Sequence, residues 1–175
     1  MDLVHIHLLL NHVPVIGLVI GFLILAWGMF RKYSDVKDAG LIVLFVTSLV
    51  AIPVYLTGEP AEEAVEKLAG VSDQLIELHE DAAVYSLALC IAVGIAAFVL
   101  LIARRFLSET LAMIGTFLVL VLAAVAGASI AYTSNLGGQV RHSEIRVAQN
   151  NAPGAESPAT EKKKENGKEK DDHDD

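Results

Sequence analysis

The stretch Leu3–Phe30, LVHIHLLLNHVPVIGLVIGFLILAWGMF, contains no aspartate, glutamate, lysine or arginine. A helix needs about 20 apolar residues to cross the roughly 30 Å hydrocarbon core of a bilayer. Three further stretches, Ala39–Gly58, Ala82–Ala103 and Thr110–Val140, are equally free of these charged residues and also long enough. An amphipathic helix of a soluble protein carries a polar face, which these stretches lack. The sequence therefore predicts an all-α integral membrane protein, a bundle of four membrane-spanning helices.

The composition agrees with this class and excludes others. The chain has 175 residues, 54% of them hydrophobic, and a mean hydropathy of +0.52 despite a polar tail. The net charge of −8 comes from loops and tail, and no basic patch with interleaved aromatics occurs, so we expect no nucleic-acid partner. The single cysteine, Cys90, lies in the third predicted span, which excludes a disulfide framework and cysteine-rich metal sites. No catalytic motif is present, so enzymatic activity is not indicated.

The chain divides into a membrane domain, residues 1–146, and a charged tail, residues 147–175. The tail has no apolar periodicity and cannot bury enough surface to offset the entropy of ordering, so we predict that it is disordered. The chain starts with Asp2 and histidines rather than a basic segment, which predicts a retained first helix and not a cleaved signal peptide. The predicted spans are residues 3–30, 39–57, 82–103 and 110–133.

A short helix is predicted between the second and third spans. Gly58 and Pro60 end the second span, and a proline in the first turn suits a new helix through AEEAVEKLAG, residues 61–70. Acidic residues share one face of this helix and apolar residues the other, which predicts a helix on the membrane surface with its acidic side toward water. The acidic residues are Glu59, Glu62, Glu63 and Glu66.

Small residues recur within the spans at the spacing of helix-packing motifs. In lipid the hydrophobic effect contributes little to helix association, so helices pack through close backbone approach at small residues. We therefore expect a compact bundle with contacts at Gly17 and Gly21 in the first span, Ala88, Ala92 and Ala96 in the third, and Ala123, Gly127 and Ala131 in the fourth.

Lysine and arginine near the span ends predict the orientation. Arg31, Lys32 and Lys37 lie between the first and second spans, and Arg104 and Arg105 lie between the third and fourth. The loop between the second and third spans is strongly acidic. By the positive-inside rule, both termini and the acidic loop face outside. In a bacterium this places a multi-pass protein in the inner membrane with its termini in the periplasm.

Polar side chains converge in depth at the outer end of the predicted bundle. Counting about 20 residues at 1.5 Å each from the inner boundaries places His12, Glu59 and His79 near one level. His142 lies beyond the fourth span, and the NLGG segment, residues 135–138, is expected to fold back over the bundle and bring it close. The membrane interior contains no buried aspartate, glutamate, lysine, arginine or histidine, which argues against an ion pump or a transmembrane proton relay.

These residue types suit two kinds of cofactor. A b-type haem needs two histidines on facing helices, for which His12, His79 and His142 are the candidates. A stripe of small residues below His79, including Ser86 and Cys90, is expected to leave room for a flat cofactor. A divalent transition metal instead needs three or four nitrogen or oxygen ligands. That set would be His12, Glu59, His79 and His142.

Three functions stay open at this point. The first is electron transfer through b-type haem at the outer face, and the second is a metal-binding or sensing module built on the same residues. The third is a non-catalytic membrane subunit whose acidic loop docks a membrane or soluble redox partner. His5 and His7 are expected only to lie in the headgroup layer, and homo-oligomerisation is left open.

Three short motifs of the chain resemble those of a known protein family. NHVP, with His12 and Pro14, opens the first span, Gly58 closes the second, and GG followed by His142 comes after the fourth. In these features the chain resembles a bacterial family of four-span membrane proteins catalogued as domain of unknown function 2231. The resemblance covers about Leu3 to Arg146 and implies a bacterial membrane protein.

Overall fold

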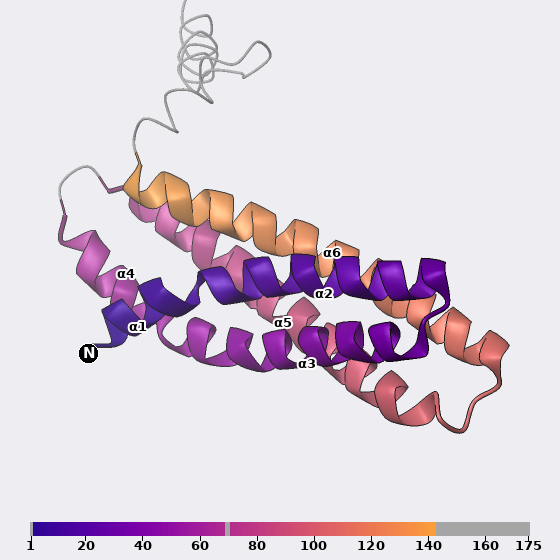
Figure 1. Cartoon of the computed structure of the whole chain (residues 1–175). Helices are drawn as coiled ribbons and strands as arrows, with labels where there is room; N and C mark the ends of the chain where they lie inside the picture. Colours follow the sequence, from indigo (N-terminus) through magenta and orange to yellow (C-terminus); the bar gives the residue numbers. More distant parts are fainter. Residues whose placement is uncertain (1, 69–70, 143–175) are drawn as a thin grey trace, which may run out of the picture.

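The structure is a computed structural model that describes residues 2–68 and 71–142. Helices and short connections make up this part of the chain, which contains no strand. Long helices lie side by side, with their connections at the two ends of the bundle (Figure 1). The helices are α1 (Leu3–Leu10), α2 (His12–Arg31), α3 (Ser34–Leu56), α4 (Gly58–Glu66), α5 (Asp73–Ala103) and α6 (Glu109–Arg141).

The prediction of four long apolar helices is confirmed. Leu3–Arg31, Ser34–Glu66, α5 and α6 are each long and apolar enough to cross a membrane. α2 packs against α3, α3 against α5, α5 against α6, and α6 against α2, so the long helices close a bundle. Its outside carries large apolar side chains, such as Leu23 and Leu118, that are more than half exposed. Such a surface suits lipid rather than water.

The first predicted span consists of two helices. α1 ends at Leu10 and α2 begins at His12. Pro14 has no N–H to donate to the carbonyl of Leu10, which weakens the helix at this point. α1 packs against α4 and α3, so its side chains meet the far end of the second predicted span.

Two helices are longer than predicted. α3 begins at Ser34 instead of residue 39, and α6 continues to Arg141 instead of ending at residue 133. The expectation that residues 135–138 fold back over the bundle is therefore wrong.

Glycine inside a helix is unfavourable by about 1 kcal/mol relative to alanine. Here Gly137 lets α6 approach α5 closely, because an added Cβ would lie 2.9 Å from the ring of His79.

The short predicted helix is present as α4, with Pro60 in its first turn. Ala61 is its buried apolar residue, and α4 packs against α1. Its place on a membrane surface stays a prediction. Gly70, expected to end this helix, and the tail at 147–175 lie outside the described residues.

α2 and α3 approach each other at glycines. An added Cβ at Gly21 would lie 2.8 Å from the side chain of Leu44, and one at Gly17 would overlap a threonine of α3. Packing at these two glycines was predicted and is confirmed. The contact at Gly40 is made with main chain, since an added Cβ there would lie 2.7 Å from Cα of Leu25. A single extra carbon at Gly40 would force α2 and α3 apart.

The other two predicted stripes of small residues face differently. On α5 the predicted alanines are exposed or half-buried, and Gly94 makes the close contact, with its Cβ position 2.6 Å from Cβ of Ser48. On α6, Ala123 is buried as predicted, but Ala131 is exposed. No described atom lies within 4 Å of a Cβ placed at Gly127, apart from its own helix and chain neighbours. A helix that is apolar all round gives no pattern from which its rotation can be predicted.

Candidate functional site

α1, α4, the first turns of α5 and the last turns of α6 meet at one end of the bundle (Figure 1). This is called the acidic end, because α4 and the first turns of α5 carry most of the glutamates of the described chain. The opposite, basic end carries the connections from α2 to α3 and from α5 to α6. Glu62 and His79 lie at the acidic end, beyond the predicted spans 39–57 and 82–103, so they are expected outside the membrane interior.

His7 joins α1 to the end of α3. Its Nδ1 atom lies 3.0 Å from the carbonyl oxygen of Val54 and 3.3 Å from Oγ1 of Thr57. Thr57 in turn donates to the carbonyl of Pro53 at 2.8 Å. The last carbonyls of a helix have no partner within the helix, and here the imidazole and the threonine hydroxyl supply donors. His7 was expected only to lie in the headgroup layer, and instead it is a half-buried tertiary contact.

His79 joins α5 to α6 in the same way. Its Nδ1 donates to the carbonyl oxygen of Thr133 at 2.9 Å. Burial lowers the pKa of His79 below its ordinary value, and the charge of His7 lowers it further, while the hydrogen bond to Thr133 opposes the shift. His79 is therefore neutral at pH 7. Its ring lies against Gly137, where any larger residue would collide with it.

The two imidazoles have the same tautomer in their neutral form. A carbonyl oxygen can only accept, so the proton of each ring is on Nδ1, and Nε2 of each ring carries a free lone pair. In the part of the chain that the structure describes, no side chain or backbone group bonds either Nε2 atom. The arrangement therefore presents two oriented imidazole donors, one from α1 and one from α5.

A hydroxyl network supports the carbonyl that holds His79. Thr133 donates to the carbonyl of Ser129 at 3.1 Å and accepts from Ser86 at 2.8 Å. The Ser86 oxygen in turn lies 2.7 Å from the Ser129 hydroxyl, which donates to it. Ser86 is buried in this contact and Cys90 is buried in the core, so helix packing fills the stripe that was expected to leave room below His79.

Glu62 and Glu80 form a carboxyl pair beside His79. Burial raises the pKa of Glu62 to about 8, and the hydrogen bond and negative charge of Glu80 raise it in the same direction. Glu62 therefore keeps its proton at pH 7 and can donate it in a hydrogen bond to Glu80, which joins α4 to α5. The acidic face of α4 is thus not uniformly solvated, because its Glu62 turns toward α5.

This pair predicts that α4 loosens from α5 at alkaline pH. The folded pKa of Glu62 lies above its ordinary value of 4.5, so its stabilising contribution is complete below about pH 4.5 and is lost as the pH rises through about 8. We expect the hydrogen-exchange protection factors of the α4 amides to fall between pH 6 and pH 9. Glu62→Gln should remove this pH dependence, whereas Glu63→Gln, at an exposed position, should keep it. Identical pH profiles for the wild type and Glu62→Gln would contradict the carboxyl pair.

The other predicted site residues lie apart from the two imidazoles. His12 is the exposed first residue of α2, Glu59 is exposed on α4, and His142 is exposed just after α6. Among the described residues, no group of three or more histidine, cysteine, aspartate or glutamate side chains is arranged to hold a metal ion. The electrostatic partners of His79 are His7 and Glu80, not His12 or Glu59.

A signal for His7 was present in the depth count. Counted from the inner boundaries, the outer hydrocarbon boundary falls at about His12 on the first span and at about Ala83 on the third. His7 lies five residues outward of His12, or about 7.5 Å, and His79 lies four residues outward of Ala83, or about 6 Å. Both are therefore about one turn above the predicted hydrocarbon boundary, and the depths of His7 and His79 match better than those of His12 and His79. What the count could not supply is the break before α2, which lets α1 pack against the ends of α3 and α4.

The fold and the site together define a class, a helical bundle with four helices long and apolar enough to cross a membrane and a pair of oriented imidazoles at one end. Comparison of the chain with protein-family models, with curated proteins and with solved structures finds no match. The resemblance to the four-span bacterial family therefore stays a prediction.

Proposed function

We propose that this protein binds a b-type haem at the acidic end of its bundle and transfers electrons through it. The observation that supports this proposal is the pair of imidazoles of His7 and His79, each oriented by a main-chain carbonyl from another helix. Bis-imidazole ligation needs one nitrogen from each of two helices, and both Nε2 atoms have a free lone pair for it. His7 takes the role that sequence reasoning assigned to His12.

Orientation by a hydrogen bond is typical of ligating histidines. A ligating imidazole usually donates its other N–H to a carbonyl or carboxylate, which fixes the ring and raises its basicity. Val54 and Thr133 supply such carbonyls here. The lowered pKa of His79 also favours ligation, because a protonated imidazole has no lone pair to give.

The number of ligands favours haem over a bare metal ion. A structural zinc site takes four protein ligands and a catalytic one takes three. The described residues offer two imidazoles and no cluster of three ligating side chains, which suits the two axial positions of a haem iron. The haem would supply one-electron chemistry, and the protein would supply its two ligands and a partly buried environment.

The location and the partner are also part of the proposal. With Arg31, Lys32, Lys37, Arg104 and Arg105 at the basic end, the positive-inside rule places that end in the cytoplasm and the His7–His79 site outside. In a bacterium the site would then face the periplasm. The glutamates of α4 would attract a soluble electron carrier with a basic surface.

The test is an absorbance spectrum of the detergent-purified full-length protein, oxidised and then reduced, with metal analysis of the same sample. The expected result is a Soret band with a sharp additional band on reduction. A bound divalent metal without a Soret band would replace haem with the metal-binding alternative. A sample with neither haem nor metal would contradict the proposal. It would favour the third function, a non-catalytic membrane subunit that docks a partner.

A further inference from the structure

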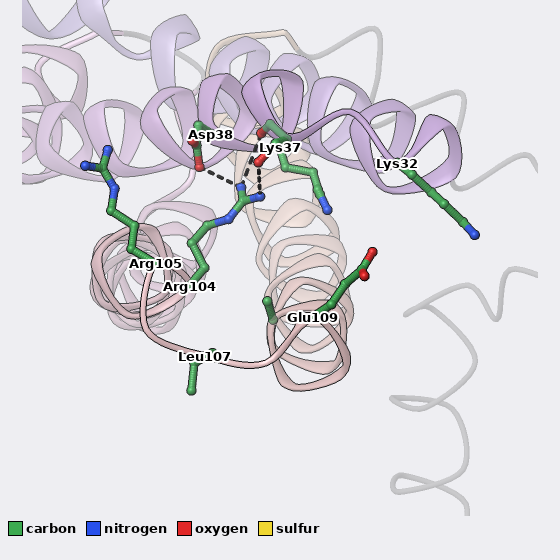
Figure 2. Close-up of a pocket in the computed structure, with 9 residues that line it drawn as sticks. Lys32, Lys37, Asp38, Arg104, Arg105, Leu107 and Glu109 are labelled. Atoms are coloured by element: carbon green, nitrogen blue, oxygen red, sulfur yellow. Dashed lines mark hydrogen bonds and ion pairs between the residues drawn. The ribbon is translucent and has the colours of Figure 1, made fainter.

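The basic end of the bundle holds a pocket of about 390 Å³ (Figure 2). The start of α3, the end of α5 and the start of α6 surround it, together with the connections of this end. Four cations and two carboxylates line it, so it carries an excess of positive charge. The cations are Lys32, Lys37, Arg104 and Arg105, and the carboxylates are Asp38 and Glu109.

Arg104 is committed to partners within the protein. Its guanidinium lies 2.6 Å from Oδ1 of Asp38 and donates to Oγ of Ser34 at 2.9 Å and to the Ser34 carbonyl at 3.3 Å. These contacts tie the end of α5 to the first turn of α3. Because Asp38 and Arg104 neutralise each other, three cations, Lys32, Lys37 and Arg105, remain in the lining against the single carboxylate of Glu109.

Lys37 is the unusual member of this lining. The residue is 9% exposed, yet its side-chain ammonium makes no hydrogen bond or ion pair with any described residue. Figure 2 shows its side chain reaching from α3 into the space above the start of α6, on the side of Glu109. The stem of Lys37 is buried, while its ammonium opens to the pocket, where it is available to an anion.

The first turn of α3 points to the same chemistry. α3 begins at Ser34, and no side chain caps it. The N–H groups of an uncapped helix start, together with the positive end of the helix dipole, favour a phosphate or another anion. Ser34 lines the pocket, so the start of α3 lies beside the space into which Lys37 reaches.

The surroundings favour a lipid as the source of that anion. The pocket lies where the predicted spans end, which is the depth of the phospholipid phosphate groups. Leu107 lines the pocket, and the neighbouring Phe106 is 85% exposed, so an acyl chain has apolar surface beside the charged space. The cytoplasmic leaflet, where the basic end is expected, is rich in anionic lipid.

We propose that this pocket binds the phosphate of an anionic phospholipid, with the Lys37 ammonium as the inner cation that contacts it and Lys32 and Arg105 at its rim. The site is separate from the His7–His79 site and does not depend on haem binding. Lys37 and the N–H groups of α3 recognise the phosphate, and the exposed apolar surface of the spans accommodates the acyl chains.

The proposal can be tested on the purified full-length protein in micelles. Native mass spectrometry and thermal shift would compare phosphatidylglycerol with phosphatidylcholine as added lipid. We expect phosphatidylglycerol to bind preferentially and to raise the melting temperature. Equal effects of the two lipids would overturn the proposal. If glycerol phosphate or inorganic phosphate binds with the same affinity as phosphatidylglycerol, the proposal of a lipid ligand is overturned. The pocket would then be assigned to a soluble phosphate compound.

Variants separate this pocket from general attraction between lipid and cations. Lys37→Gln should weaken phosphatidylglycerol binding about tenfold, as expected for the loss of one charge-assisted hydrogen bond. The matched control is Lys67→Gln, an exposed lysine after α4 at the other end, which should bind as the wild type does. If Lys37→Gln folds poorly, the double variant Lys32→Gln/Arg105→Gln removes two exposed rim charges and should also weaken binding. Wild-type binding by the Lys37 or the double variant would overturn the proposal.

Discussion

His79→Ala is expected to abolish the Soret absorbance of the haem-loaded protein, and His7→Ala is expected to do the same. Each substitution removes one of two axial nitrogens, and the described residues offer no third histidine beside the pair. Loss of either ligand ends bis-imidazole coordination. The measurement is the oxidised and reduced spectrum, with haem content determined on equal amounts of folded protein.

His12→Ala and His5→Ala are the matched controls. His12 is exposed at the start of α2, and His5 is exposed and bonded to Asp2 at 2.7 Å, so neither has contacts that would hold a cofactor. Both variants should keep the full spectrum. Loss of absorbance in His12→Ala with retention in His7→Ala would restore the assignment made from sequence and refute the one made from structure. His79→Gln adds a check on folding, because its amide can still donate to the carbonyl of Thr133.

Gly40→Val is expected to lower the free energy of unfolding by about 1–3 kcal/mol, the range typical of overpacking. The added Cβ would lie 2.7 Å from both the backbone nitrogen and Cα of Leu25. Main chain cannot move aside by changing a rotamer, so α2 and α3 must separate along their contact. Unfolding by a denaturing detergent in mixed micelles would measure the change.

The control is the same substitution at Gly127. No described atom beyond its own helix and chain neighbours lies within 4 Å of a Cβ placed there, so Gly127→Val meets open space on α6. Its stability should stay within about 0.5 kcal/mol of the wild type, as is usual for substitutions on an open surface. Equal stability of the two variants would mean that α2 and α3 are not held by close backbone approach at Gly40.

The candidate site shows where prediction from sequence stopped. His79 and its depth near the outer end of the predicted bundle followed from the chain, and the structure places it on α5, which begins at Asp73. Its partner did not, because His7 and His12 are both polar residues in one apolar stretch and only the break before α2 decides which packs inward. The Glu62–Glu80 pair was also missed, since a glutamate on an amphipathic helix is normally solvated.

The number and approximate positions of the four long apolar helices can be read from the amino-acid sequence. They depend on the transfer of uncharged stretches such as Leu3–Phe30 into lipid, which is a local property summed along the chain. The rotation of each helix is a different matter, because a span that is apolar on every side has no polar face to orient it. Side-chain packing between helices decides that rotation. Only the tertiary structure could therefore pair His7 with His79, select Gly40 over Gly127 for close contact, and bury the stem of Lys37 beside the pocket of the basic end.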